Sequence, residues 1–312
     1  MEKFSFDKVD ILLIEPDRTV RMAIRNILVD NGFRNVTIGS GIADIETKLR
    51  IGTPDLLISE IKLEDGNLNA FVYGLRHHAV GSNPFLPIIA TMWSPTTEDV
   101  RAIIQAGADD IITKPLSAGQ ILQRIKGLVN ARKPFVVTSR YIGPDRRKPG
   151  EDHDRGEKIH PIQVPNTLRA KAIGDKSMSV EQIQREIDVC IKKVNLEKLE
   201  RHATQLTWLV ERILPALERG APTEDTTKML QRLNYVSEDS SRRMVGTPYA
   251  HVGDLIHSLT NVTQRILEAG NAPLPKDIDL LKPLTQAIER GFGTHNSKDT
   301  ETAREITKTI KM

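Results

Sequence analysis

Short apolar runs alternate with amphipathic stretches through the first 131 residues of the chain. Runs bounded by charged or turn-forming residues are typical of buried parallel strands, and we predict strands at 11–14, 36–38, 56–58, 87–90 and 111–112. Apolar residues at helical spacing predict helices at 18–29, 42–49, 69–76, 97–105 and 117–131. This order predicts an α/β fold over 8–131, a doubly wound five-stranded parallel sheet with helices on both faces.

The alternation stops at residue 132. The segment 132–178 contains one short run that can be extended, 134–138, and is otherwise rich in proline, glycine and charge. It carries 11 Lys and Arg against 6 Asp and Glu. This composition predicts a basic linker or arm that is partly disordered.

Helical periodicity returns over 179–312 and predicts an all-α domain, a helical bundle or a coiled-coil-like arrangement. The longest predicted helix covers 180–214, and Pro215 is expected to kink or end it. Further helices are predicted at 225–240, 252–269, 275–290 and 299–311. Apolar positions over 183–213 repeat every three or four residues with one shift of register. Such a seam forms either a core within one chain or the contact of a homodimer.

The composition excludes several classes of protein. Hydrophobic residues are 39% of the 312 residues, enough for a core in each of about two domains. The chain has no apolar run of ~18 residues and no apolar signal core at its start, so we expect neither a membrane span nor secretion. Cys190 is the only cysteine, which excludes intramolecular disulfides and favours a cytoplasmic location. The basic excess lies in 132–178 and forms no large face, so nucleic acid is not the expected main partner.

Charged side chains follow the ends of several predicted strands. Glu15 and Asp17 follow the first strand, Glu60 follows the third, and Lys114 follows the fifth. In doubly wound sheets, ligands bind outside the carboxyl ends of the strands. The three carboxylates and the lysine therefore predict a charged site at that edge of the sheet.

These features resemble the receiver domain of two-component response regulators over roughly 8–131. The resemblance is carried by four motifs: Ile11-Leu-Leu-Ile-Glu-Pro-Asp17, Asp55-Leu-Leu-Ile-Ser-Glu-Ile-Lys-Leu-Glu-Asp-Gly66, Leu86-Pro-Ile-Ile-Ala90 and Gly107-Ala-Asp-Asp-Ile-Ile-Thr-Lys-Pro115. The resemblance implies an aspartate after the third strand that accepts a phosphoryl group, and an acidic pair after the first strand that holds Mg²⁺. It also implies a hydroxyl and a lysine that contact the phosphoryl group, and an aromatic residue on the fifth strand that responds to the hydroxyl.

The phosphorylation site departs from this pattern at its acidic positions. Glu60 stands where the family has the phospho-accepting aspartate. Glu15 matches the first member of the acidic pair, but Pro16 stands at the second, and Asp17 lies one residue further on. Mg²⁺ requires near-octahedral oxygen geometry, so the loss of one carboxylate predicts a metal site that is weak or absent.

The switch positions depart as well. Met92 falls where the family has the hydroxyl, and a thioether donates no hydrogen bond to a phosphoryl oxygen. Ile111 replaces the aromatic residue, while Lys114 is retained. We interpret the segment as a pseudo-receiver that acts by protein–protein interaction with little or no phosphorylation at Glu60. One sharper hypothesis is that Glu60 pairs with Lys114 and mimics a permanently switched state of the receiver. The simpler hypothesis is that the ion pair is a remnant of a site that has lost its function.

Two alternatives remain open. In the first, the chain is an active phosphorelay component that uses Asp17, Glu60 or His257. His257 lies in a segment that faintly resembles a histidine phosphotransfer helix, although Thr260 and Asn261 replace that helix's lysine and glycine. In the second, the arm binds nucleic acid through residues such as Arg146.

The expected partners are signalling proteins, either a histidine kinase or a downstream effector. The sequence shows no Gly-rich phosphate loop and no nucleophile elbow, so we expect no enzymatic output.

Overall fold

The computed structural model describes residues 4–147, 159–174, 179–270 and 272–293. By compactness the chain divides into two units, Met1–Ile191 and Lys192–Met312. The predicted helix at 299–311 lies outside the described residues, as do the parts 148–158 and 175–178 of the predicted arm.

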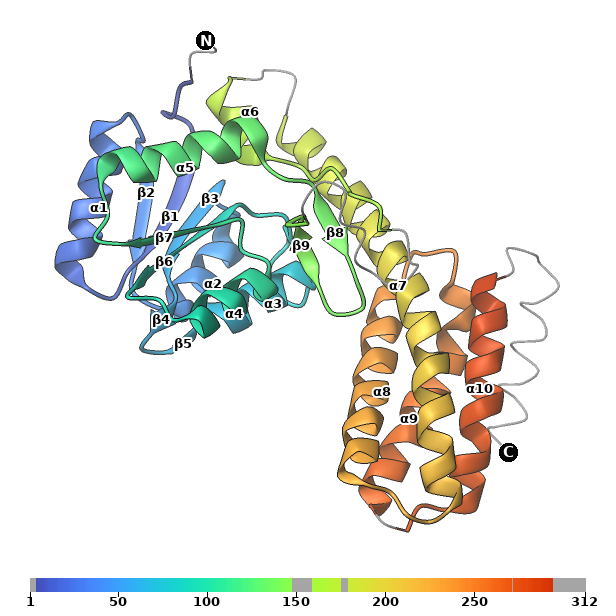
Figure 1. The fold of residues 1–312 in the computed structure, drawn as a ribbon. Helices are drawn as coiled ribbons and strands as arrows, with labels where there is room; N and C mark the ends of the chain where they lie inside the picture. Colours follow the sequence, from blue (N-terminus) through green and yellow to red (C-terminus); the bar gives the residue numbers. More distant parts are fainter. Residues whose placement is uncertain (1–3, 148–158, 175–178, 271, 294–312) are drawn as a thin grey trace. The chain divides into compact units, whose positions relative to one another are not determined.

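A parallel sheet with the strand order β2-β1-β3-β6-β7 forms the centre of the first unit (Figure 1). Its strands are β1 (Asp10–Ile14), β2 (Asn35–Gly39), β3 (Leu56–Glu60), β6 (Ile88–Trp93) and β7 (Asp110–Lys114). The predicted fold class is confirmed. A small hairpin that the sequence pattern did not predict follows β3; it is made of β4 (Lys62–Leu63) and β5 (Gly66–Asn67).

Helices cover both faces of this sheet, as Figure 1 shows. One face carries α1 (Arg18–Asp30) and α5 (Ala118–Ala131), and the other carries α2 (Ile42–Ile51), α3 (Leu68–Arg76) and α4 (Thr97–Ala106). Alternate residues of each strand point to opposite faces, so Leu13 packs under α1 and α5 while Leu12 packs on the other side. The central strands β1, β3 and β6 are therefore buried on both faces, which explains their continuous apolar runs in the sequence, whereas the edge strand β2 is largely exposed.

The described part of the predicted arm is folded and packs within the first unit. It forms an antiparallel hairpin, β8 (Phe135–Val137) and β9 (Ile142–Pro144), and a short helix, α6 (Thr167–Ala172). Leu168 and Ala172 join the core under α1 and α5. This differs from the linker that the turn-rich composition predicted.

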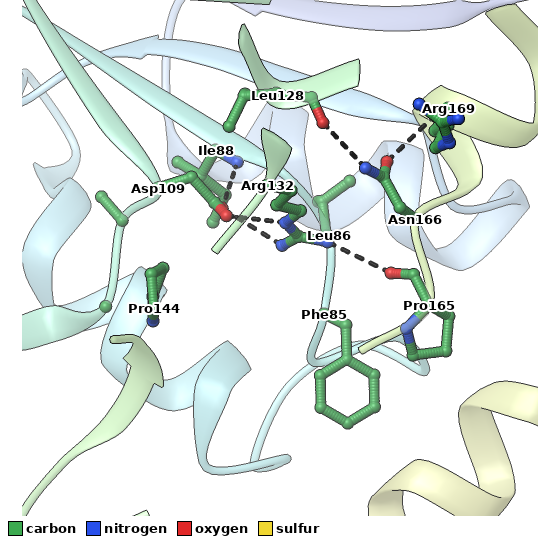
Figure 2. A network of polar contacts seen from close by, with 12 residues as sticks. Phe85, Leu86, Ile88, Asp109, Leu128, Arg132, Pro144, Pro165, Asn166 and Arg169 are labelled. Carbon is green, nitrogen blue, oxygen red and sulfur yellow. Dashed lines mark hydrogen bonds and ion pairs between the residues drawn. The ribbon is translucent and has the colours of Figure 1, made fainter. Parts of the chain in front are cut away.

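Buried polar contacts hold the arm in place, as Figure 2 shows. Arg132 donates to both carboxylate oxygens of Asp109 and to the carbonyl of Pro165. Asn166 donates to the carbonyl of Leu128 at 2.8 Å, near the end of α5. The segment after α5 is thus tied to the sheet and to the last turn of α5.

The second unit is a helical bundle. It contains most of α7 (Val180–Glu218), then α8 (Glu224–Arg243), the 3₁₀ turn η1 (Ala250–Val252), α9 (Gly253–Ala269) and α10 (Pro275–Gly293). One apolar core draws side chains from all four α-helices. The predicted all-α character is confirmed. None of the helices in the described ranges combines the length and apolar character that a membrane span requires.

Helix α7 runs through Pro215 to Glu218, beyond the end that we predicted at residue 214. Proline lacks one N–H donor, and this close to the end of a helix the loss affects little more than the last turn. Seam residues Leu199, Leu206 and Val210 lie in the bundle core. This burial favours the intrachain core over the dimer seam.

A cluster of buried polar and charged side chains lies between α7 and α8, and the apolar periodicity of the sequence did not reveal it. The side chains of His202 and Asp239 are 0% and 1% exposed. Asp239 accepts a 2.8 Å hydrogen bond from Arg243. Burial would raise the pKa of Asp239, but the guanidinium of Arg243 holds it below its usual range.

Candidate functional site

Most of the predicted site residues, but neither Ile111 nor His257, lie at one edge of the first unit's sheet. Glu15 directly follows β1, Glu60 ends β3, Met92 lies near the end of β6, and Lys114 ends β7. The strands are parallel, so their carboxyl ends meet at this edge.

Lys114 lies between two carboxylates in the interior. Its Nζ donates to Oε2 of Glu15 and to Oε2 of Glu60. The exposed fractions of the three side chains are 1% for Lys114, 3% for Glu15 and 8% for Glu60. The triad thus places two carboxyl groups against one ammonium group, and a single ammonium can balance only one carboxylate.

The remaining oxygens of the two glutamates accept backbone hydrogen bonds. Oε1 of Glu15 accepts from the N–H of Asp17 at 3.1 Å. Oε1 of Glu60 accepts from the N–H groups of Ile61 and Lys62 at 2.9 and 3.3 Å. All four carboxylate oxygens therefore have a partner within the protein.

A pocket of about 270 Å³ opens above the triad. Of the predicted residues, Glu15, Pro16, Asp17, Glu60 and Met92 line it. Lys114 lies beneath the two glutamates that line it. The predicted switch position Ile111 lies apart, half-buried on β7, where it packs against the core under α2, α3 and α4.

Four further pocket residues were not predicted: Ile61, Lys62, Trp93 and Asp99. Trp93 ends β6 with 55% of its surface exposed, and its ring centroid is 5.5 Å from Nζ of Lys114. Asp99, in the first turn of α4, also lines the pocket, together with Lys62, whose Nζ is 3.6 Å from Asp99 Oδ2. Two sequence signals could have indicated Trp93 and Asp99. Trp93 is an aromatic residue at the end of a strand, and Asp99 is an acidic residue in the first turn of the helix that follows that strand.

Helix capping holds the two outer carboxylates in place. Oδ1 of Asp17 accepts from the N–H groups of Thr19 and Val20, at 2.7 and 3.0 Å. Asp99 accepts from the N–H and the hydroxyl of Thr96. Backbone hydrogen bonds hold the pKa of Asp17 and of Asp99 below the usual range, so both are ionised at neutral pH.

The residues present do not fit the Mg²⁺ that the resemblance implies. A Mg²⁺ ion needs carboxylate oxygens that are open to it, at 2.0–2.1 Å in near-octahedral geometry. Both oxygens of Glu15 and of Glu60 already accept hydrogen bonds, and Pro16 offers no side-chain ligand. Among the described residues, no group of three or more His, Cys, Asp or Glu side chains is arranged to hold a metal.

His257 lies apart from this pocket, in the bundle. It is exposed on α9 and borders a hollow of about 560 Å³ between α8 and α9. The hollow is lined by Tyr235, Glu238, Ser241, Arg242, His257 and Thr260. The neighbouring helix therefore supplies a cation, Arg242, which the segment around His257 lacks.

Two of the arm's arginines have structural partners. Arg146 donates to the carbonyls of Ala108 and Asp109, at 2.6 and 3.1 Å. Arg147 forms a 2.8 Å ion pair with Asp145. These contacts favour a structural role for the arm over a nucleic-acid surface.

A five-stranded doubly wound sheet with a charged site at its carboxyl edge defines a receiver-like α/β domain. Residues 11–126 match the family model described as the response regulator receiver domain. These residues are therefore a response regulator receiver domain.

Curated relatives match the same part of the chain. The KDP operon transcriptional regulatory protein KdpE of Escherichia coli (strain K12) is 28% identical over 120 residues, 38% of this chain and 49% of that protein. The swarming motility regulation protein RssB of Serratia marcescens is 32% identical over 135 residues, 43% of this chain and 59% of that protein. The chain thus spans about half the length of the curated relatives that it matches.

A similar solved structure is the CheY-like response regulator receiver domain protein of Methanospirillum hungatei JF-1. It is 23% identical and covers 38% of this chain and 90% of its own, with a TM-score of 0.35.

Proposed function

We propose that the receiver domain is a pseudo-receiver: a binding module of a two-component signalling pathway that acts by protein–protein contact, with little or no phosphorylation at Glu60. The observation that carries the proposal is the position of Lys114, whose ammonium group is bonded to both Glu15 and Glu60.

Phosphoryl transfer to a carboxylate needs an oxygen that can attack and cations that neutralise the charge of the transferred group. Here both oxygens of Glu60 accept hydrogen bonds, and the nearest buried cation already neutralises part of a carboxylate pair. Met92, rather than a hydroxyl, lines the pocket. An anionic phosphodonor therefore meets a negatively charged site with no metal position.

The partner in this proposal is a histidine kinase or a downstream effector, and the receiver domain contributes a surface rather than an enzymatic activity. By analogy with the family, the docking face is formed by α4, β7 and α5. The half-buried Ile104 and Ile111 supply apolar contacts there.

The test is the intact mass of the full chain after incubation with a small phosphodonor and Mg²⁺, with and without a chelator. We expect no added phosphoryl group in either condition. A chelator-sensitive adduct that maps to Glu60 or Asp17 would refute the pseudo-receiver.

A second candidate, phosphotransfer through His257, is favoured by one observation. The imidazole of His257 is exposed beside a hollow that also contains Arg242, a cation suited to an incoming phosphoryl group. This function predicts an acid-labile adduct on His257 that is absent from a His257→Gln variant. Transfer to a different residue, or none from any donor, would exclude it.

A further inference from the structure

The exposed ring of Trp93 borders a pocket whose other features are suited to an organic cation. The walls combine the indole, the apolar side chains of Met92 and Pro16, and ionised carboxylates at the rim. Aromatic faces attract cations through the ring quadrupole, and the attraction grows when the cation is partly removed from water.

Acidic side chains outnumber basic ones both at the base and at the rim of the pocket. At the base, Glu15 and Glu60 offer two carboxyl groups to the single ammonium group of Lys114. At the rim, Asp17 and Asp99 add two negative charges, and Lys62 returns one positive charge. The Lys62–Asp99 pair is long, at 3.6 Å, and the lysine side chain is 73% exposed, so this pair is weak and easily displaced.

The rim carboxylates are oriented before any ligand arrives. Asp17 uses Oδ1 to cap α1, and Asp99 uses Oδ2 to cap α4. Within the described residues, Oδ2 of Asp17 and Oδ1 of Asp99 accept no hydrogen bond from the protein. Each side chain is thus held in place through one oxygen, which lowers the entropic cost of binding through the other.

The size of the pocket indicates one side chain rather than a cofactor. Its volume of about 270 Å³ lies just below the range of ~300–1,000 Å³ typical of small-molecule sites. A phosphate group is disfavoured by the charge. A divalent metal is disfavoured because the oxygens of Glu15 and Glu60 are already engaged. A guanidinium is planar, stacks on aromatic rings and pairs with carboxylates through several N–H donors.

We propose that this pocket binds an arginine side chain of a partner protein, with the guanidinium stacked on Trp93 and hydrogen-bonded to Asp17 and Asp99. The inference rests on the proposed function, because it requires a pocket that does not carry out phosphoryl chemistry. In this proposal the partner contacts two surfaces: the α4–β7–α5 face, and the pocket at the position of the family's phosphorylation site.

The experiment uses the full chain with Trp208→Phe, which leaves Trp93 as its only tryptophan. A capped Gly-Ser-Arg-Ser-Gly peptide is titrated while Trp93 emission is recorded, and calorimetry gives an independent Kd. The matching citrulline peptide keeps the shape and removes the charge. Free L-arginine tests whether the ligand is instead the amino acid, whose α-carboxylate the pocket should repel.

We expect saturable binding of the arginine peptide, and at least about tenfold weaker binding of the citrulline peptide and of free arginine. The double variant Asp17→Asn/Asp99→Asn should also bind at least about tenfold more weakly. Asparagine is as good an N-cap as aspartate at position 17, and at position 99 its side-chain oxygen can still accept from the N-cap Thr96, so this variant should fold. Asp65→Asn is the matched control, because Asp65 caps α2 outside the pocket.

Equal binding of the citrulline peptide, or full binding by the double variant, would overturn the arginine assignment. Tighter binding of free arginine would overturn the partner-protein source. The phosphodonor experiment separates the two proposals. An adduct on Glu60 removes the proposed function, whereas no adduct together with no peptide binding removes only the arginine assignment.

Discussion

Asp109 and Arg132 form a two-point ion pair that joins the sheet to the segment after α5. Nε of Arg132 lies 2.7 Å from Oδ1 of Asp109, and Nη2 lies 3.2 Å from Oδ2. The two side chains are 4% and 2% exposed. Asp109 also pairs with Arg76 at 2.9 Å and accepts from the N–H of Ile88, where β6 begins. One carboxylate thus fixes the start of β6 and the arm, as Figure 2 shows, and also the end of α3.

Replacing this carboxylate should loosen the arm and destabilise the receiver unit. Asp109→Ala leaves the guanidinium groups of Arg76 and Arg132 buried without their shared anion. Removing one partner of a buried ion pair typically costs ~3–5 kcal/mol. Urea unfolding of the Trp208→Phe chain, followed by Trp93 emission, reports this unit alone and measures the loss.

The neighbouring Asp110 provides the control. Its ion pair with Arg124 is 3.3 Å long and largely exposed, with side chains 28% and 51% accessible. Asp110→Ala should therefore change the unfolding free energy by less than ~1 kcal/mol. Equal effects of the two substitutions would contradict the role given to Asp109.

The second prediction concerns Lys114. Lys114→Met leaves Glu15 and Glu60 buried side by side without a cation, and we expect a loss of ~3–5 kcal/mol in unfolding free energy. Glu60→Gln keeps the Lys114–Glu15 pair and should cost less. The double variant Lys114→Met/Glu60→Gln should recover part of the loss, because only one uncompensated carboxylate remains. A double variant no more stable than Lys114→Met would argue against charge balance as the cause.

The order of the strands and helices could be predicted because apolar periodicity and strand burial are local properties. Each predicted strand over 8–131 exists, but each observed strand is longer than predicted, as in β7, which was predicted at 111–112 and spans Asp110–Lys114. A polar residue at the end of an apolar run does not reveal whether its backbone still forms hydrogen bonds with the neighbouring strand. The arm was not predicted to pack, because its contacts depend on Asp109 and Arg132, which are 23 residues apart.

The site was only partly predictable for a similar reason. Strand ends placed Glu15, Glu60 and Lys114 at one edge, but only the folded chain shows that Lys114 bonds both glutamates. Trp93 and Asp99 were missed because neither belongs to the motifs of the resemblance. Their place in the pocket depends on where β6 ends and α4 begins.

The third prediction tests what the phosphorylation site lacks. Glu60→Asp alone should gain no phosphoryl group from a small donor, because the second acidic residue and the hydroxyl are still missing. The combination of Pro16→Asp, Glu60→Asp and Met92→Thr restores the pattern that the resemblance implies. We expect this triple variant alone to show a Mg²⁺-dependent adduct in intact mass. An adduct on Glu60→Asp alone would mean that the other two departures matter little.

The last prediction concerns the pH dependence of the bundle. His202 is fully buried, and its Nδ1 lies 3.1 Å from Oγ of Ser240. Burial, with repulsion from Lys198 and Arg243, lowers the pKa of His202 to about 3, although Asp239 opposes the shift. In the unfolded chain this pKa is about 6.5. Between pH 6.5 and 3 the unfolded state therefore binds more protons than the folded state, so His202 reduces stability as the pH falls through this window.

Replacing His202 should weaken this acid sensitivity. A His202→Gln variant keeps a polar group near Ser240 but cannot take up the proton. Between pH 7 and 5 the parent chain should lose up to ~2 kcal/mol more unfolding free energy than this variant. Trp208 emission in a Trp93→Phe background reports the bundle, and His257→Gln, a change of an exposed histidine in the same unit, is the matched control. If the parent and His202→Gln chains lose stability equally over this range, His202 does not carry the acid sensitivity of the bundle.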